Sequence, residues 1–279
     1  KIIFSSSTQV NLKNSYGISK KNCEKKLIFL SKKTNSQIII LRLPNIFGKW
    51  SKPNYNSVVS TFCHNIIKNK KNKIENPKKM INFLYIDDLI ELFFNLFKHQ
   101  KKKIVYPKIY SQYQISLKDL NHTIENFHKK RKKLFIMDMS NNFTKNLYST
   151  YLSFLDKKNF HYKYKHKSDS RGSFAEILKS EIFGQISILK CKPGETRGNH
   201  YHHSKVEKFF PISGKGKFVK QNLLTNQRYI YNFDDKQPVV IETVPGWTHY
   251  LQNTGSKDLV MVIWTNDIFD KKKTDTYKA

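Results

Sequence analysis

Cysteine is scarce in this sequence, and its few copies are poorly spaced for cross-linking. The three residues are Cys23, Cys63 and Cys191, and no two of them form a Cys-x-x-Cys pair. A sparse, odd-numbered set supports neither a disulfide framework nor a zinc ribbon. We therefore expect a cytoplasmic protein whose thiols stay reduced.

Long hydrophobic runs are also absent. No apolar stretch reaches the ~18 residues that a membrane-spanning helix needs, so we expect no membrane partner. The sequence nevertheless has 279 residues, of which 38% are hydrophobic. That length and composition exclude disorder and allow two domains, each with a sizeable core.

Arginine is rare although the chain is strongly basic. Only five of the 51 basic residues are Arg, and the formal net charge is +30. A cationic surplus attracts polyanions. Here, however, lysine is spread among Asn, Ile, Phe and Tyr, all with AT-rich codons. We interpret the lysines as compositional bias and expect no nucleic-acid partner, although the runs at 129–133 and 271–273 can attract anionic nucleotides. A non-catalytic basic binding protein is the less favoured alternative.

The pattern of apolar residues changes near residue 165. Before it, buried apolar runs such as "QIIILRLPNIFG" alternate with segments of helical spacing, which is typical of an α/β Rossmann-like domain. After it, short β-prone runs are separated by turn residues. We predict domains at 1–165 and 166–279, the second one all-β. The expected helices are 15–33, 56–70 and 87–99. Asp87 is expected to cap the last of these, and "SLKD" at 116–119 predicts a capping box for another helix.

Tyr16 and Lys20 are four residues apart in the predicted helix 15–33, which places the phenol and the ammonium on one face. A cation that close favours the phenolate, so Tyr16 can serve as an acid or base near neutral pH. Ser7 ends the preceding strand, where its hydroxyl can bind a substrate carbonyl oxygen. The Tyr-x-x-x-Lys spacing alone also fits two exposed helical residues.

The order of "FSSSTQ", "YGISK", "LRLPNIFG" and "FLYIDDLI" resembles the extended short-chain dehydrogenase/reductase family, which acts on nucleotide sugars. The resemblance implies the cofactor NADP(H), with Tyr16 as proton donor and Lys20 holding the nicotinamide ribose. It assigns Ser7 to the substrate carbonyl, with Ser6 and Thr8 as alternatives. It also implies that Asn45 lies near the sugar nucleotide, with Asn56 and His64 as further candidates for substrate binding, although His64 also fits a polar residue on a helix.

One element of that family is missing from the sequence. Rossmann-like domains bind the dinucleotide pyrophosphate at a glycine-rich turn after the first strand, where a helix N-terminus meets the anion. The ten glycines here form no Gly-x-x-Gly-x-x-Gly turn, and the sequence opens at Lys1 within an apolar run. We interpret this as N-terminal truncation and expect it to impair reductase activity.

Three histidines and a glutamate carry the second candidate site. His200 and His202 point to the same face if they lie on one strand, because side chains alternate with period two. Glu207 and His249 can converge on them from neighbouring strands, whereas His203 would face the other way. Three imidazoles and one carboxylate suit a divalent first-row metal, with zinc as our expectation. A lone His-x-His pair would more often be surface residues.

The spacing of this cluster resembles the two-part signature of the cupin superfamily. The first part runs from Gly194 through the paired histidines and the glutamate to Gly214. The second part is Gly246-x-x-His249-x-x-x-Asn253, with the family's proline shifted by one place to Pro245. The resemblance implies a cupin barrel for 166–279.

A reductase followed by a cupin resembles the CapF (WbjC) family of bifunctional capsular polysaccharide enzymes. The likeness includes "FGKWSKPNYNSVVSTFCHNI", "DSRGSFAEILK", "GNHYHHSKVEKF" and "WTNDIFDKKKTDTY". It implies C3 epimerisation of UDP-2-acetamido-2,6-dideoxy-4-hexulose by the cupin half. The reductase half would then reduce the C4 ketone with NADPH on the route to UDP-N-acetyl-L-fucosamine. We also expect a homodimer.

The implied chemistry is coherent. The C4 ketone makes the C3 proton acidic, so epimerisation needs a base and stabilisation of the enolate oxygen. A metal could polarise the ketone or be structural, and spacing assigns no base. A cupin-type metal-dependent oxygenase or isomerase unrelated to sugars is the alternative enzyme.

Overall fold

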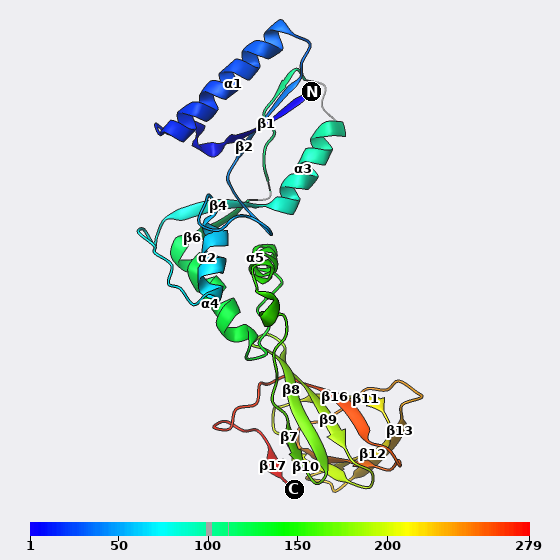
Figure 1. Cartoon of the computed structure of the whole chain (residues 1–279). Coiled ribbons are helices and arrows are strands. Elements are labelled where there is room, and N and C mark those ends of the chain that lie inside the picture. The colour runs from blue at the N-terminus through cyan, green and yellow to red at the C-terminus, as the bar shows by residue number, and fades with distance from the viewer. Residues whose placement is uncertain (99–101, 111) are drawn as a thin grey trace. The chain divides into compact units, whose positions relative to one another are not determined.

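The computed structural model describes residues 1–98, 102–110 and 112–279 and contains two compact units. The first unit comprises 1–129 and 139–160, and the second comprises 130–138 and 161–279. These units differ from the expected division at 165, because residues 130–138 belong to the second unit. This segment is attached there by two backbone hydrogen bonds of 2.8 Å, one from the Ile136 amide to the Lys179 carbonyl oxygen and one from the Lys179 amide to the Leu134 carbonyl oxygen. Figure 1 shows the elements of both units.

The first unit contains a parallel three-stranded sheet in the order β1 (Ile2–Ser7), β2 (Ile38–Leu43) and β5 (Ile104–Val105). Strand β2 is almost wholly buried, as expected for a parallel strand covered on both faces. Helices α1 (Ser15–Lys33) and α3 (Ile86–Lys98) flank the sheet in Figure 1. Leu89 and Leu96 of α3 pack against Ile39 and Leu41 of β2.

A second sheet of the first unit has the order β3 (Asn45–Phe47), β4 (Met80–Tyr85) and β6 (Tyr113–Ser116). Strands β3 and β4 are parallel, and β6 is antiparallel to β4. Phe47 packs edge-on against Phe83 and Phe143, with ring centroids 5.9 and 5.6 Å apart. The remaining α-helices described in this unit are α2 (Val58–Ile67), α4 (Leu117–Arg131) and α5 (Asn142–Ser153).

The helix ends test the capping predictions. Helix α1 spans the predicted residues 15–33, and Asn14 caps it by accepting a 2.6 Å bond from the Gly17 amide. The capping box is confirmed, because Ser116 Oγ accepts from the Asp119 amide and donates to Asp119 Oδ2. The prediction for Asp87 was wrong: α3 begins at Ile86, and Asp87 lies in its first turn, paired with Lys49. Residue 99 of the predicted helix lies outside the described residues.

The second unit consists of two mainly antiparallel sheets. Their orders are β13-β12-β15-β10-β17 and β14-β11-β16-β9-β8-β7. The strands are β7 (Lys167–Asp169), β8 (Gly172–Ser180), β9 (Gly184–Cys191), β10 (Thr196–Tyr201), β11 (Glu207–Ser213), β12 (Lys215–Asn222), β13 (Arg228–Asp234), β14 (Ile241–Glu242), β15 (Trp247–Asn253), β16 (Leu259–Thr265) and β17 (Tyr277–Lys278).

Alternating side chains build the core of this second unit. Leu259, Met261 and Ile263 of β16 are buried at every second position, as the period of a strand requires. They pack with Phe209 of β11 and Phe218 of β12, so the core takes side chains from both sheets. The predicted all-β organisation after residue 165 is confirmed.

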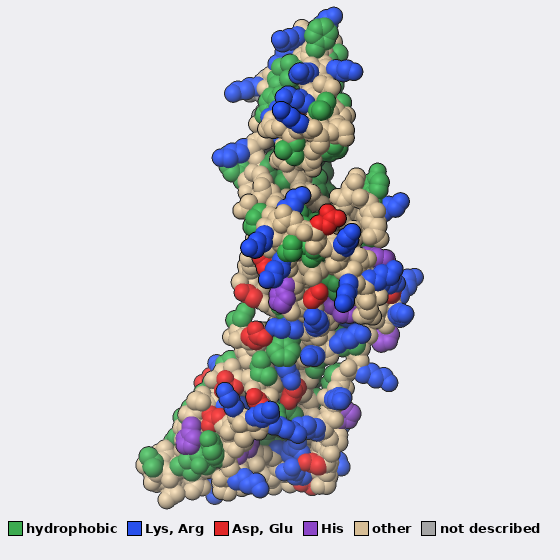
Figure 2. All heavy atoms as spheres, turned by 90° about the vertical axis from the view of Figure 1, so that its left-hand side faces the viewer, with side chains coloured by type: hydrophobic (Ala, Val, Ile, Leu, Met, Phe, Trp, Pro, Cys, Tyr) green, Lys and Arg blue, Asp and Glu red, His purple; other side chains and the backbone are tan. Residues whose placement is uncertain are grey.

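The basic side chains are dispersed. On the face drawn in Figure 2, Lys and Arg are scattered over both units instead of forming one stripe. No helix among the described residues has the length and apolar character needed to span a bilayer.

Candidate functional sites

A cavity of about 700 Å³ in the first unit contains most of the predicted reductase residues. Its lining includes Ser7, Tyr16, Lys20, Asn45 and Asn56. Strand β1 supplies the serine at its carboxyl end, α1 supplies the tyrosine and the lysine, and β3 supplies Asn45. Parallel strands direct their carboxyl ends to the same edge of a sheet, which is where ligands bind in this class of fold.

Tyr16 and Lys20 lie on one face of α1. Lys20 Nζ donates a 2.8 Å bond to the Ser5 carbonyl oxygen and lies 5.7 Å from the centroid of the Tyr16 ring. The Tyr16 side chain is half-exposed and open to the cavity. The ammonium is therefore tethered to the end of β1 beside the phenol.

The serines at the end of β1 have different partners. Ser6 Oγ donates to the buried carboxylate of Glu24. Ser7 Oγ accepts a 3.2 Å bond from the Gln9 amide, which leaves its proton available to a ligand in the cavity. This arrangement favours Ser7 over Ser6 for a contact with a carbonyl oxygen.

An ion pair between the buried Glu24 and the exposed Arg42, which the sequence analysis missed, supports this cavity. Glu24 is 3% exposed and accepts bonds of 3.1 and 2.7 Å from Arg42 Nε and Nη2. Burial raises the pKa of Glu24, but hydrogen bonds from Arg42 and Ser6 outweigh burial and leave the pKa below its usual 4.5. Glu24 thereby ties α1 to β1 and β2. Arginine is rare in the first unit, and this rarity was the feature of the sequence that could have indicated a role for Arg42.

His64 lies on α2, is partly buried and is not among the residues that line the cavity. Asn45 Nδ2 is 3.5 Å from the Asn82 carbonyl oxygen.

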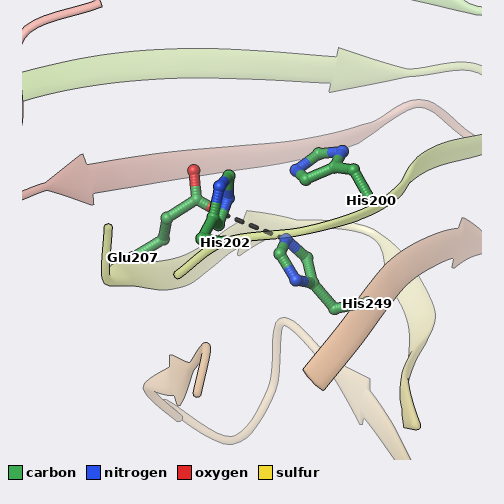
Figure 3. Close-up of side chains that lie close together, drawn as sticks. All are labelled: His200, His202, Glu207 and His249. Carbon is green, nitrogen blue, oxygen red and sulfur yellow. Dashed lines mark hydrogen bonds and ion pairs between the residues drawn. The ribbon is translucent and has the colours of Figure 1, made fainter. Parts of the chain in front are cut away.

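In the second unit, four side chains gather as the sequence predicted. His200 lies on β10, His202 just beyond it, Glu207 at the start of β11 and His249 on β15. Figure 3 shows these side chains pointing toward one another. One potential ligand atom from each lies within 4.8 Å of the others. His203 is exposed and packs instead against the rings of Tyr201 and Tyr277.

The register between β10 and β15 brings two of these histidines together. His200 pairs directly with His249 after a bulge between Gly198 and His200. Gly198 has φ = +99°, and a Cβ there would lie 2.9 Å from the His249 carbonyl oxygen. The close approach of the two strands therefore requires glycine at this position.

Hydrogen bonding makes His202 suitable as a metal ligand. Its Nδ1 donates to the backbone carbonyl of Asp275, so in that tautomer Nε2 carries a lone pair. Nε2 is buried, has no hydrogen-bond partner among the described residues and lies 3.4 Å from Glu207 Oε2. A lone pair facing a carboxylate is unfavourable unless a proton or a metal ion lies between them, and a divalent ion fits this set of ligand atoms.

The charge states also suit a cation. Burial, reinforced by the neighbouring His249, lowers the pKa of His200 to about 4. Burial acts to raise the pKa of Glu207, but the adjacent His202 and His249 rings and the Lys205 ammonium hold that pKa well below its ordinary value. Near pH 7 the cluster therefore offers a neutral His200 imidazole and an ionised carboxylate.

The other residues of the two-part spacing pattern have structural roles. Gly194, Gly214 and Gly246 all have positive φ. Asn253 is fully buried, and its amide donates to the carbonyl oxygens of Cys191 and Lys257. These residues fix the turns around the histidines.

Three residues of the cluster, His200, Glu207 and His249, line a pocket of about 330 Å³. Arg171, Arg197 and Lys205 line it, together with Phe174, Phe209 and Phe218. Both arginines pair with Asp169 at 2.7 Å, and Lys205 Nζ lies 3.1 Å from Glu207 Oε1. The pocket thus combines an aromatic wall with three cationic side chains, none of which the sequence analysis had singled out.

Comparison with known proteins covers nearly the whole chain. The UDP-2-acetamido-2,6-beta-L-arabino-hexul-4-ose reductase of Pseudomonas aeruginosa is 42% identical over 99% of this chain and 74% of that relative. The crystal structure of the capsular polysaccharide assembling protein CapF from Staphylococcus aureus matches 99% of this chain and 77% of its own, with 34% identity and a TM-score of 0.92. The chain belongs to the CapF family.

Two family models match separate parts of this chain. Residues 3–111 match the NAD dependent epimerase/dehydratase family, and residues 167–277 match the polysaccharide biosynthesis C-terminal domain. A CapF structure with the inhibitor 3-isopropenyl-tropolone also aligns, with 32% identity, a TM-score of 0.87 and coverage of 99% of this chain and 78% of that one.

Proposed function

We propose that this CapF relative is a bifunctional UDP-sugar enzyme of capsular or O-antigen polysaccharide synthesis. The second unit, a cupin barrel, epimerises C3 of UDP-2-acetamido-2,6-dideoxy-4-hexulose. The first unit reduces the C4 ketone with NADPH on the route to UDP-N-acetyl-L-fucosamine. The relative named as a hexul-4-ose reductase supports a 4-keto UDP-sugar as substrate.

The observation that carries the proposal is the four-residue cluster at the base of a cationic pocket. His200, His202, Glu207 and His249 would hold a divalent ion, which supplies Lewis acidity toward the C4 ketone when bound. Lys205 adds a positive charge where an enolate oxygen would form.

The remaining pocket residues suit the rest of such a substrate. In the part of the chain that the structure describes, Arg171 and Arg197 are both paired with the one carboxylate of Asp169, so these three side chains keep a net positive charge. Planar guanidinium groups bind phosphate oxygens well, so we assign the pair to the UDP diphosphate.

The cavity of the first unit suits reduction of the same ketone. Ser7 Oγ donates a hydrogen bond to the ketone oxygen, and Tyr16 delivers a proton to that oxygen as charge develops on it. Lys20 and Tyr16 would hold the nicotinamide ribose of NADPH, the source of the hydride. The sequence contains no glycine-rich turn for the cofactor pyrophosphate, so we assign no residue to that group.

Deuterium exchange tests the proposal. In D₂O without NADPH, the protein should replace the C3 proton of the 4-keto sugar nucleotide with deuterium, measured by proton NMR. His249→Ala should abolish exchange, because a ligand atom of the cluster is removed. His203→Ala is the matched control, since His203 is an exposed neighbour outside the cluster, and it should exchange normally. Equal exchange by both variants would refute the assignment.

A further inference from the structure

The last strand, β17, lies directly against β10, the strand that carries His200. Strand β17 pairs with β10, placing Lys278 opposite His200 and Tyr277 opposite Tyr201. The Tyr277 and Tyr201 rings stack with centroids 5.3 Å apart. This pairing brings the two preceding residues, Asp275 and Thr276, to the loop between His202 and Glu207.

The Asp275 carboxylate organises that loop. It accepts hydrogen bonds from three consecutive amides, those of His203, Ser204 and Lys205, at 2.9, 2.7 and 2.8 Å. It also accepts a 2.9 Å bond from Ser204 Oγ. This loop connects His202 to Glu207. The Asp275 side chain therefore fixes the backbone between two of the proposed ligands, including the backbone of Lys205.

The backbone of Asp275 acts on a ligand itself. Its carbonyl oxygen accepts the proton of His202 Nδ1, which sets the orientation and tautomer of the ring. A hydrogen bond to the nitrogen remote from the ion is how proteins orient metal-binding imidazoles. The same residue therefore holds the His202 ring through its carbonyl and the following loop through its carboxylate.

We infer that Asp275 is a positioning residue for the metal centre. The clamp made by its carboxylate fixes the segment 203–205, and this keeps its carbonyl aligned on His202 and keeps Lys205 directed into the pocket. This inference rests on the metal centre proposed above. It adds a role for a residue of the chain end that contributes no ligand atom.

The test uses the full chain with Asp275→Ala, Asp275→Asn and the control Asp270→Ala. Asp270 lies in the same tail, and its carboxylate accepts a 2.9 Å bond from the Lys272 amide within its own turn. Three quantities are measured: Co²⁺ affinity by chelator competition, the visible absorption spectrum of bound Co²⁺, and hydrogen exchange of the amides of 203–205. Circular dichroism establishes that each variant is folded.

Asp275→Ala should weaken Co²⁺ binding by about 10- to 100-fold, alter the Co²⁺ spectrum and speed exchange at 203–205. Asp275→Asn keeps one acceptor oxygen, so its Co²⁺ affinity and exchange rates should lie between those of Asp275→Ala and the unsubstituted protein. Asp270→Ala should match the unsubstituted protein in all three measurements. Unchanged affinity and spectrum in a folded Asp275→Ala would overturn the inference and leave the metal centre standing. An unsubstituted protein that binds no Co²⁺ would overturn both. If Asp275→Ala is unfolded, Asp275→Asn decides between the same outcomes.

Discussion

Gly198→Ala should damage the fold and the metal centre together. Gly198 lies in the bulge that brings His200 opposite His249, with φ = +99°. An added Cβ would lie 2.9 Å from the His249 carbonyl oxygen and 3.0 Å from the Tyr250 Cα. Both atoms belong to the backbone of β15, so they can yield only if the strands separate where the two histidines meet.

Two costs add in this variant. Placing alanine in the left-handed region costs about 1–2 kcal/mol. Forcing a methyl group into a packed contact costs about 1–3 kcal/mol more. The expected destabilisation is therefore about 2–5 kcal/mol. Gly194→Ala is the matched control, because Gly194 has φ = +78° but no atom of the described residues lies within 4 Å of an added Cβ. Gly194→Ala should lose only the stability that the left-handed backbone costs, about 1–2 kcal/mol.

Denaturant unfolding of both variants, followed by fluorescence of Trp247 and Trp264 in the second unit, provides the comparison. Co²⁺ titration should show weaker binding for Gly198→Ala and near-normal binding for Gly194→Ala. If the two variants lose equal stability and bind Co²⁺ alike, the close approach of β10 and β15 is not what requires glycine, and the reasoning fails.

Two further predictions concern the first unit. Tyr16→Phe should lower NADPH-dependent ketone reduction by roughly two to four orders of magnitude through loss of the proton donor, and an unchanged rate would contradict that role. The lowered pKa of Glu24 means that its ionisation stabilises the fold above its usual value of 4.5, and this stabilisation is lost as pH falls through the lower folded value. The melting temperature should therefore fall less between about pH 5 and 3 in Glu24→Gln than in the unsubstituted protein, and parallel curves would contradict the effect.

Elements with a regular apolar period were predictable from the sequence. Helix α1 and the buried strand β2 follow their patterns closely. Strand β10 was assumed only to place His200 and His202 on one face, because "TRGNHY" has no apolar alternation, and β17 was not predicted because it has only two residues. Both are held by pairing with distant strands, which local composition does not encode.

The candidate sites show the same limit. The family resemblance predicted the gathering of His200, His202, Glu207 and His249, whereas the period-two argument held only in part, because β10 ends at Tyr201 and His202 lies just beyond it. The contacts that orient these residues were not foreseen, because Asp275 is 73 positions from His202, and Glu24 is 18 positions from Arg42. Such contacts depend on how strands pair, and no spacing rule links the residues that make them.

The most direct test of the account is whether C3 exchange depends on the metal and not on NADPH. The protein is stripped with a chelator, checked by elemental analysis, and incubated with the 4-keto sugar nucleotide in D₂O before and after Zn²⁺ is restored. We expect exchange in the metal-loaded protein without NADPH, loss of exchange on stripping and its return with about one Zn²⁺ per chain. Full exchange by the stripped protein, or exchange that requires NADPH, would contradict it.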